Sequence, residues 1–522
     1  MKESPDVTTN YMGGKAFKQS PKEELVFAVI TSFMESTYYE SAEGRHDRIT
    51  ALVETVALTD PTFVAKLAVY NRKRFHMRSS THAMLAAFAR THRGDSLVRQ
   101  AIVGATERPD DLTEILALLP KPIPNGVKRG VAAALVGFDE YSLGKYRGEG
   151  HKMSLIDAVN LTHPAGNGNV GLAKLVKDEL RSTDTWETKV SAAGGDEEAT
   201  TEAWRELLEE GKLGYMAALR NLVNIAKTGE ISLANKVAEL ISDKERVRTS
   251  KQLPFRFLSA WGALEALEEG KTRHGKAMPF ESDNKAKAVV VEPLKQAVKA
   301  ALGHSADNIP VLEGQTLILT DNSGSMRGDA GGNSLLSAYS NPKTSDIANL
   351  FAALYWAKAK DTAVGTFGDK LLMPELTRDM DVFAAFKAID KTAAEVGPGT
   401  EEGVFVAFEK LLADKRKVAR ILIFSDQQVG EGCSWYDTGR RGTGGLRGGS
   451  DFNKLLQEYR TFSPETVIYS VDLQGYGNKL FGDGVFLLAG FSDRIFELME
   501  LLEQDKKALV RDIEAIELPK VA

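Results

Sequence analysis

One carboxylate and two hydroxyls stand close together in the sequence QTLILTDNSGSM, which starts at Gln315. They belong to Asp321, Ser323 and Ser325, and the apolar run before them is typical of a strand buried on both faces. Oxygen ligands at the carboxyl end of a strand suit a hard divalent cation, Mg²⁺ first, with Mn²⁺ and Ca²⁺ as alternatives. The same residues also fit a simple turn in which Asp and Ser cap backbone groups.

Two more polar residues favour the metal. A glycine-rich turn, GPGT, presents Thr400 ahead of a helical pattern, and a second apolar strand, VARILIFSD, ends on Asp426. The carboxyl ends of strands in open α/β sheets are where such sheets bind ligands. In residue type and order, the set resembles the metal-ion-dependent adhesion site of von Willebrand factor A domains. This resemblance implies five metal ligands: Asp321, Ser323, Ser325, Thr400 and Asp426.

A site of this kind favours docking over hydrolysis. Hydroxyl ligands are neutral, so the cation stays electrophilic and keeps an open position for an acidic side chain or a phosphate of a partner. Hydrolysis would need a general base and often a second metal, and no second carboxylate cluster lies nearby in the sequence. The chain also lacks a Gly-rich phosphate-binding motif with Lys, a His-Glu-x-x-His motif and a nucleophile triad. We therefore expect a protein that is not an enzyme.

The chain of 522 residues is too long for a single core, and its charge divides unevenly. Residues 1–300 carry 42 Lys and Arg against 40 Asp and Glu, whereas residues 301–522 carry 24 against 32. The single cysteine, Cys433, excludes an intrachain disulfide and favours a reducing compartment. No signal-peptide pattern opens the chain, and no apolar run approaches a membrane span. We expect a cytoplasmic monomer that does not contact a membrane.

The elements that must position these residues fall into two groups. Residues 1–20 are polar and predict a flexible arm, and from Pro21 short helical patterns follow one another to about residue 300. Such a series favours an α-solenoid of HEAT-like helical pairs over residues 21–305, with a plain helical bundle as the alternative. Over residues 306–522, apolar strands alternate with helices and predict a doubly wound α/β domain. The expected strands lie near 315–320, 362–367, 418–424, 465–471 and 485–489.

Basic residues gather in four stretches of the helical half. The first, NRKRFHMRSSTH, lies in a window between Asp60 and Asp95 that has no acidic residue, and it sets four Lys and Arg residues and two histidines around Phe75. Cations among aromatics are the composition of a nucleic-acid surface, because charge binds phosphates and rings stack on bases. The alternative is a solvated basic face. The candidate RNA-binding residues in the four stretches are Arg72, Lys73, Arg74, His76, Arg78, His82, Lys121, Lys128, Arg129, Lys145, Arg147, His151, Lys152, His163 and Arg256.

The helical half resembles the TROVE module of Ro ribonucleoproteins. The stretches NRKRFHMRSSTH, KYRGEGHKMSLIDAVNLTHP and LPFRFLSAW carry this resemblance, and the order of a helical-repeat half before a von Willebrand A half matches too. It implies a ring of HEAT-like repeats closed by the A domain. Such a ring binds single-stranded 3′ ends of misfolded or immature non-coding RNAs in its central hole and Y RNAs on its outer basic surface. It also implies an exoribonuclease partner such as polynucleotide phosphorylase.

Within that resemblance, Lys145, Arg147 and His163 match the RNA-binding stretch of the family, with His151 and Lys152 in its middle. Glu149 departs from the family pattern, which is basic or neutral there, and AGNGN after His163-Pro164 lacks the usual following lysine. These departures make binding of single-stranded ends better supported than binding of Y RNA.

Two functions follow from these observations. The first is non-catalytic RNA binding in RNA quality control or processing, which needs only charge for the backbone and stacking for unpaired bases. The second is a metal-dependent protein-docking module without RNA binding, whose helical half is a generic scaffold. The basic stretches with interleaved aromatics favour the first, because docking alone gives no reason for them.

Overall fold

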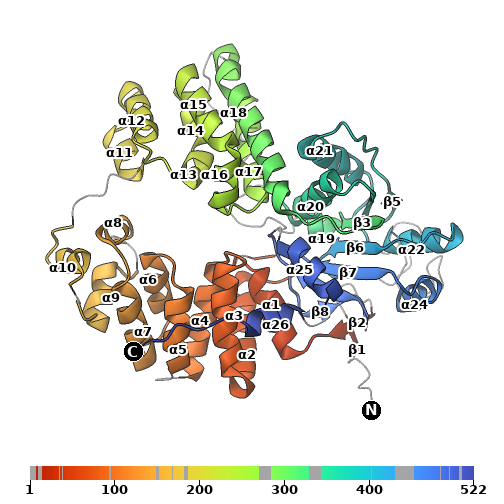
Figure 1. Ribbon diagram of the computed structural model, residues 1–522, viewed down its shortest axis with the longest axis horizontal. Coiled ribbons are helices and arrows are strands. Elements are labelled where there is room, and N and C mark those ends of the chain that lie inside the picture. Colours follow the sequence, from red (N-terminus) through yellow and green to blue (C-terminus); the bar gives the residue numbers. More distant parts are fainter. Residues whose placement is uncertain are drawn as a thin grey trace.

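The computed structural model consists of a helical N-terminal part and a part built on a six-stranded sheet (Figure 1). The residues that it describes are 7–9, 15–34, 36–37, 39–92, 96–147, 152–166, 168–180, 186–269, 284–328, 342–400, 403–429, 452–482, 484–492, 494–504 and 508–521. No helix among them combines the length and the apolar character needed to cross a bilayer.

The helical part follows an arc in which helices pack mainly on their second neighbours (Figure 1). Contacts join α2 to α4, α3 to α5, α5 to α7 and α7 to α9, which is the arrangement of stacked helical pairs and confirms the solenoid-like architecture. The helices are α1 (Pro21–Ile30), α2 (Ala42–Thr59), α3 (Pro61–Lys73), α4 (Ser79–Thr91), α5 (Ser96–Ala105), α6 (Pro109–Ala117), α7 (Asn125–Leu135), α8 (Glu140–Lys145), α9 (Leu155–Thr162), α10 (Val170–Val176), α11 (Trp186–Ala192), α12 (Glu197–Glu209), α13 (Tyr215–Arg220), α14 (Leu222–Lys227), α15 (Ile231–Ser242), α16 (Lys244–Ser250), α17 (Phe255–Glu268) and α18 (Asn284–Ser305).

Local sequence explains where these helices begin. Ser20 caps α1 by accepting a hydrogen bond from the backbone of Glu23, whose side chain accepts one in return from the Ser20 backbone. Asp60 caps α3 in the same region of the fold, and the prolines that follow both caps occupy the first helical turn, where a missing N–H costs nothing.

The sheet has the strand order β5-β4-β3-β6-β7-β9, and all neighbours are parallel except β5. Its strands are β3 (Thr316–Asp321), β4 (Thr362–Phe367), β5 (Leu371–Leu372), β6 (Arg420–Ser425), β7 (Val467–Asp472) and β9 (Phe486–Ala489). Its helices are η1 (Ala306–Asn308), α19 (Gly324–Arg327), α20 (Thr344–Lys358), α21 (Val382–Ala393), α22 (Gly403–Ala413), α24 (Phe452–Phe462), α25 (Arg494–Gln504) and α26 (Ala508–Glu514).

Helices cover both faces of this sheet. Ile318 and Phe424 belong to the core that includes Phe351 of α20, whereas Leu319 and Ile423 belong to a second core with α22 and α24. Side chains on both faces are buried because the strands are continuous apolar runs, as in other parallel sheets. The five strands expected from the sequence are present within about two residues of their predicted bounds.

The expectation of a flexible arm over residues 1–20 is wrong for two short segments. β1 (Val7–Thr9) pairs with β2 (Lys15–Lys18), and β2 pairs with β8 (Asn478–Lys479) to form a small antiparallel sheet. Phe17 on β2 is buried and its ring packs against Gly482. Local composition could not predict β2, because its partner β8 lies far away in the sequence.

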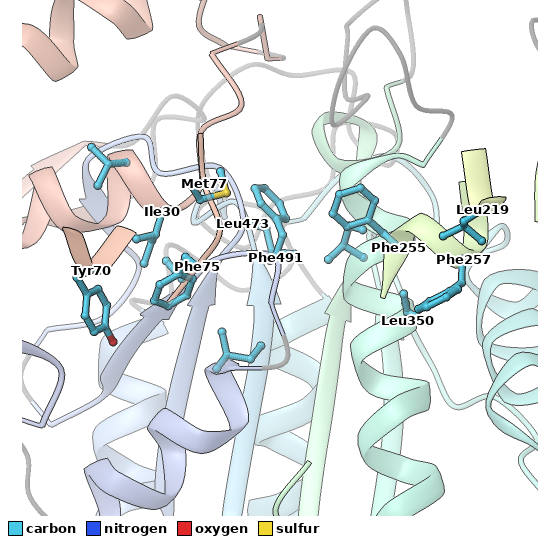
Figure 2. Close-up of a cluster of buried hydrophobic side chains, with 14 of the residues drawn as sticks. Ile30, Tyr70, Phe75, Met77, Leu219, Phe255, Phe257, Leu350, Leu473 and Phe491 are labelled. Atoms are coloured by element: carbon cyan, nitrogen blue, oxygen red, sulfur yellow. The ribbon is translucent and has the colours of Figure 1, made fainter. Parts of the chain in front are cut away.

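Three aromatic rings join both ends of the helical part to the sheet; we call this meeting point the seam. Phe33, which follows α1, stacks on Phe491 after β9 with ring centroids 5.1 Å apart. It also meets Phe255 of α17 edge to face at 6.0 Å. Figure 2 shows Phe255, Phe491 and the neighbouring Phe75 and Met77 side by side above the strands. The segment after α1 and the start of α17 therefore meet beside the end of β9.

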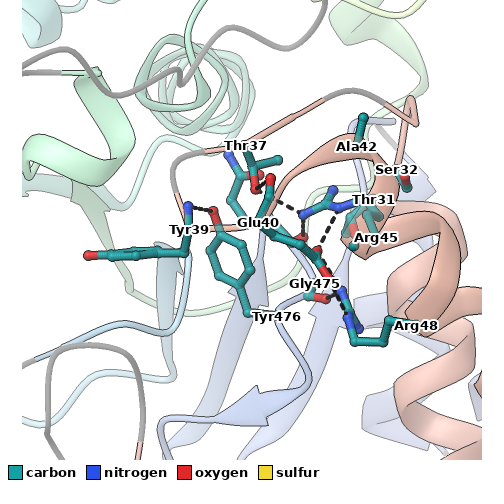
Figure 3. A network of polar contacts seen from close by, with 12 residues as sticks. Thr31, Ser32, Thr37, Tyr39, Glu40, Ala42, Arg45, Arg48, Gly475 and Tyr476 are labelled. Carbon is teal, nitrogen blue, oxygen red and sulfur yellow. Dashed lines mark hydrogen bonds and ion pairs between the residues drawn. The ribbon is translucent and has the colours of Figure 1, made fainter.

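A polar clamp joins α2 to the loop after β7 (Figure 3). Arg45 is 2% exposed, and its guanidinium binds Glu40 at 2.8 Å and donates to the Gln474 carbonyl at 2.9 Å. Arg48 donates to the Gly475 carbonyl at 2.6 Å and pairs with Glu40. The backbone N–H of Tyr39 donates to the Tyr476 hydroxyl at 3.4 Å.

The last residues return to the helical part. α26 packs on α3, where the Tyr70 hydroxyl donates to Asp512 at 2.8 Å and Lys66 donates to the Glu514 carbonyl. Pro519 then reaches Gly104 of α5, leaving no room there for a larger side chain. Both ends of the described chain thus cross between the two parts.

Candidate functional site

The sheet places the five candidate metal ligands together at the carboxyl ends of its central strands. β3 and β6 are parallel neighbours, with Thr320 opposite Phe424, so Asp321 and Asp426 follow at the same edge. Burial is nearly complete for all of the set, which is Asp321, Ser323, Ser325, Thr400 and Asp426.

Hydrogen bonds fix the first half of this set. The Asp321 carboxylate accepts from the Ser323 N–H at 2.9 Å and from the Ser425 hydroxyl at 2.7 Å. The hydroxyls of Ser323 and Ser325 lie 3.3 Å apart. Ser325 stands in the first turn of α19, so a tight turn after β3 brings the two hydroxyls to the same side.

Gln428 links the other two candidate ligands, Thr400 and Asp426. Its N–H donates to one Asp426 oxygen at 3.0 Å, and its carbonyl accepts from the Thr400 hydroxyl at 3.3 Å. The other oxygen of Asp426, Oδ2, is buried without a hydrogen-bond partner among the described residues. A buried carboxylate oxygen without a donor is costly, and a cation would satisfy it.

The two carboxylates also perturb each other. Burial, with the negative charge of Asp321 as the next cause, raises the pKa of Asp426 to about 8. Burial likewise raises the pKa of Asp321. Within the described residues, no three His, Cys, Asp or Glu side chains gather as a metal site. The residues therefore fit a divalent cation only if hydroxyls complete the ligand set, which is the chemistry of a Mg²⁺ site that retains water.

Three of the candidate RNA-binding residues surround one buried carboxylate, Asp111. Arg72 and Arg78 pair with it at 3.3 and 2.7 Å, and the His82 imidazole hydrogen-bonds to it at 3.0 Å. Burial favours the neutral acid, but the hydrogen bond from His82 and the charge of Arg72 outweigh it and hold the pKa of Asp111 well below its usual range. The structure thus gives Arg72, Arg78 and His82 a role in joining α3, α4 and α6.

A second group gathers around Tyr146. Arg108 lies over its ring at 4.4 Å and Lys145 at 5.6 Å. Arg147 pairs with Asp178, a surface contact that contributes little to stability. Both cations lie beside a half-buried tyrosine, where they can hold a phosphate next to a stacked base, although Arg108 also pairs with Asp110 at 2.6 Å. Arg108 was missing from the predicted set because it stands outside the four basic stretches.

The other candidates lie at separate places on the helical part. Lys73 and Arg74 are exposed at the end of α3, and His76 is half-buried in the turn after it. Lys152 donates to the Ala117 carbonyl at 3.1 Å, and Arg256 lies beside the Phe255 ring at 5.0 Å. The remaining exposed or half-buried candidates are Lys121, Lys128, Arg129 and His163. His151 lies outside the described residues.

Residues 174–312 match the family model of the TROVE domain. A stretch of 106 residues is 37% identical to telomerase protein component 1 of Mus musculus, and the protein of that name in Rattus norvegicus matches equally well. These matches span 20% of the chain and 4% of each rodent protein, so they concern one segment of much longer relatives.

A solved structure extends the likeness to nearly the whole chain. The crystal structure of the Ro (RSR) protein of Deinococcus radiodurans aligns with a TM-score of 0.59 and covers 91% of this chain and 99% of that one. At 16% identity this shows a shared fold of both parts. Residues 174–312 are therefore similar to the TROVE domain, and the chain as a whole shares the fold of the Deinococcus radiodurans Ro protein.

Proposed function

We propose that the chain binds single-stranded 3′ ends of misfolded or immature non-coding RNAs. The observation that carries this proposal is the placement of Lys73, Arg74, Arg108 and Lys145 on turns and helix ends of the helical part, with Tyr146 between two of them. Cations hold the sugar–phosphate backbone, and the ring stacks on an unpaired base, so no catalytic group is required.

The seam supports the further proposal that the helical part forms a ring closed by the sheet. Phe33 contacts both Phe255 and Phe491, so the two ends of the arc meet. A single strand fits through such a ring more readily than a duplex, which gives a reason for preferring unpaired 3′ ends. Y RNA binding on the outer surface is a weaker proposal, since Glu149 and AGNGN depart from the family pattern.

We also propose that Asp321, Ser323, Ser325, Thr400 and Asp426 hold Mg²⁺ or another divalent cation. The ion would supply an electrophilic position for an acidic side chain of a protein partner. An exoribonuclease such as polynucleotide phosphorylase is the partner class that this RNA role implies.

The decisive experiment is a filter-binding titration at two salt concentrations. It compares a duplex that has a single-stranded 3′ tail with the same duplex made blunt. Tight, tail-dependent and salt-sensitive binding is the expected result, because released counterions make phosphate contacts weaken with salt. Weak binding that ignores the tail would contradict RNA-end binding and favour the alternative, a metal-dependent protein-docking module.

A residue-level test uses Lys145→Ala combined with Arg147→Ala. If these side chains contact phosphates, affinity falls and the slope of log affinity against log salt becomes flatter, by about 0.7 for each lost contact to a single strand. Unchanged affinity and slope would remove them from the interface.

A further inference from the structure

A cavity of about 260 Å³ opens beside the seam, and we call it the seam pocket. Its walls come from three places that are far apart in the sequence. Lys73, Arg74 and His76 come from the turn between α3 and α4, Lys251 follows α16, and Arg494 starts α25. None of the candidate metal ligands lines it.

The charges in the seam pocket are unbalanced. Five cations line it against one carboxylate, Glu497. Glu497 already pairs with Arg494, and a second cation, Arg248, pairs with Glu245 outside the pocket. The remaining three, Lys73, Arg74 and Lys251, make no ion pair within the part of the chain that the structure describes. Like charges that converge without counterions repel one another, and an anion would relieve this repulsion.

The backbone is strained at two of these positions. His76 has φ 56° and Lys251 has φ 53°, in the left-handed region that side chains rarely adopt. At His76 the turn lets Phe75 and Met77 bury on either side while the imidazole faces the pocket. Strained non-glycine residues cluster at ligand sites, where surrounding packing holds them in place.

Further support comes from His76 itself. Burial lowers the pKa of its imidazole, and the charge of Lys251 lowers it further. The charge of Lys251 therefore reaches the imidazole, although the nearby Glu107 carboxylate acts on its pKa in the opposite direction.

We propose that the seam pocket binds a phosphate group of single-stranded RNA. Arginine and lysine are the donors that proteins use for phosphate, arginine as a planar fork and lysine as a mobile point charge. The volume lies below the roughly 300–1,000 Å³ of pockets for drug-sized ligands, so it suits one phosphorylated nucleotide rather than a longer segment. The inference rests on the proposed RNA binding and names where one phosphate is held.

Bound phosphate has a structural effect as well. The pocket walls come from the turn after α3, from the end of α16 and from α25, so the anion is shared by all three. A ligand that binds only the closed arrangement stabilises it by mass action. RNA that enters the pocket therefore strengthens the seam.

The test compares Lys73→Ala combined with Lys251→Ala against a matched control, Lys177→Ala combined with Lys227→Ala. The control lysines are exposed, lie on the helical part and change the net charge equally. Circular dichroism verifies that both variants fold. Inorganic phosphate should raise the melting temperature of wild type and control but not of the pocket variant. An equal rise in all three proteins, or no rise in any, would overturn the site.

Single-stranded RNA then tests the link to function. The pocket variant should bind about tenfold more weakly than the control at 0.2 M salt, with a salt slope lower by about 0.7 for the one lost phosphate contact. Control-like RNA binding by the pocket variant would overturn the proposal and leave the proposed function intact. Failure of wild type and control to bind RNA would instead contradict the proposed function.

Two RNA versions identify the source of the phosphate. One carries phosphate at both ends and the other carries hydroxyls. If the pocket variant loses more affinity for the phosphorylated RNA than for the hydroxyl-ended RNA, the pocket holds a terminal phosphate. If it loses the same affinity for both, the pocket holds an internal phosphodiester.

Discussion

At the scale of single residues, the basic motif NRKRFHMRSSTH divides into two functions. Arg72, Arg78 and His82 are committed to Asp111, whereas Lys73 and Arg74 have no such partner among the described residues and remain exposed. The sequence alone could not separate them, because Asp111 lies on another helix, outside the acid-free window. Composition identified a basic segment, and only packing decided which cations face solvent.

We expect Asp111→Asn to destabilise the helical part by roughly 3 kcal/mol, because it removes the buried carboxylate shared by Arg72, Arg78 and His82 and leaves Arg72 with Glu107 alone. The pKa of Asp111 is lowered in the fold, so its contribution is present above the ordinary pKa and is lost as pH falls through the folded value. The difference in melting temperature between wild type and variant should therefore be full at pH 7 and shrink below about pH 4. Asp110→Asn, at a more exposed neighbour, is the control.

The candidate metal centre gives a second prediction at this scale. With its pKa raised to about 8, Asp426 is mostly neutral at pH 7 without a metal, and its Oδ2 has no hydrogen-bond partner among the described residues. Asp426→Asn should therefore lower stability in EDTA by no more than about 1 kcal/mol. The rise in melting temperature on adding Mg²⁺ should disappear in the variant and persist in Asp414→Asn, an exposed control. A Mg²⁺ response that is equal in both variants would exclude Asp426 as a ligand.

At the scale of elements, the sequence predicted what depends on continuous patterns. The five apolar strands and most helices came from periodicity, and the ligand set followed because parallel strands end at one edge. The two-residue strand β5 and the small sheet of β1, β2 and β8 were missed because so short a segment carries no periodic signal.

The small sheet should contribute measurably to stability. Phe17→Ala removes a buried ring from β2 and should cost about 3–5 kcal/mol, seen as a lower melting temperature. Val7→Ala on β1 should have little effect, since Val7 is 60% exposed. Equal melting temperatures of the two variants would mean that β2 does not hold the N-terminus to the sheet.

At the scale of the whole molecule, two kinds of contact hold the parts together. The seam is aromatic, and the clamp of Arg45 and Arg48 is polar and directed at backbone carbonyls of the loop after β7. Because that loop follows directly on Asp472, beside the strand that carries Asp426, the clamp supports the edge where the candidate metal ligands lie.

Loss of the clamp should be visible on both of its sides. In Arg45→Ala combined with Arg48→Ala, amide hydrogen exchange should speed up in residues 36–48 and in residues 473–480. The loop after β7 loses hydrogen bonds to two of its carbonyls, and the segment before α2 loses the arginine partners of Glu40. The control Arg246→Ala, at an exposed position of α16, should leave both segments protected. Faster exchange on one side only would show that the clamp does not couple them.

The pairing of β2 with β8 also determines which part of the protein can fold first during synthesis. Gln19 donates to the Asn478 carbonyl, 459 residues further along the chain. At roughly 5–20 residues per second, a ribosome needs about 20–90 s to make that partner. The helical part, whose contacts are mostly between near neighbours, can fold during this wait, while β2 stays unpaired. Closure then waits until Asn478 and Phe491 have been made, and a ribosome stalled before Asn478 would present a folded helical arc with its aromatic seam still open.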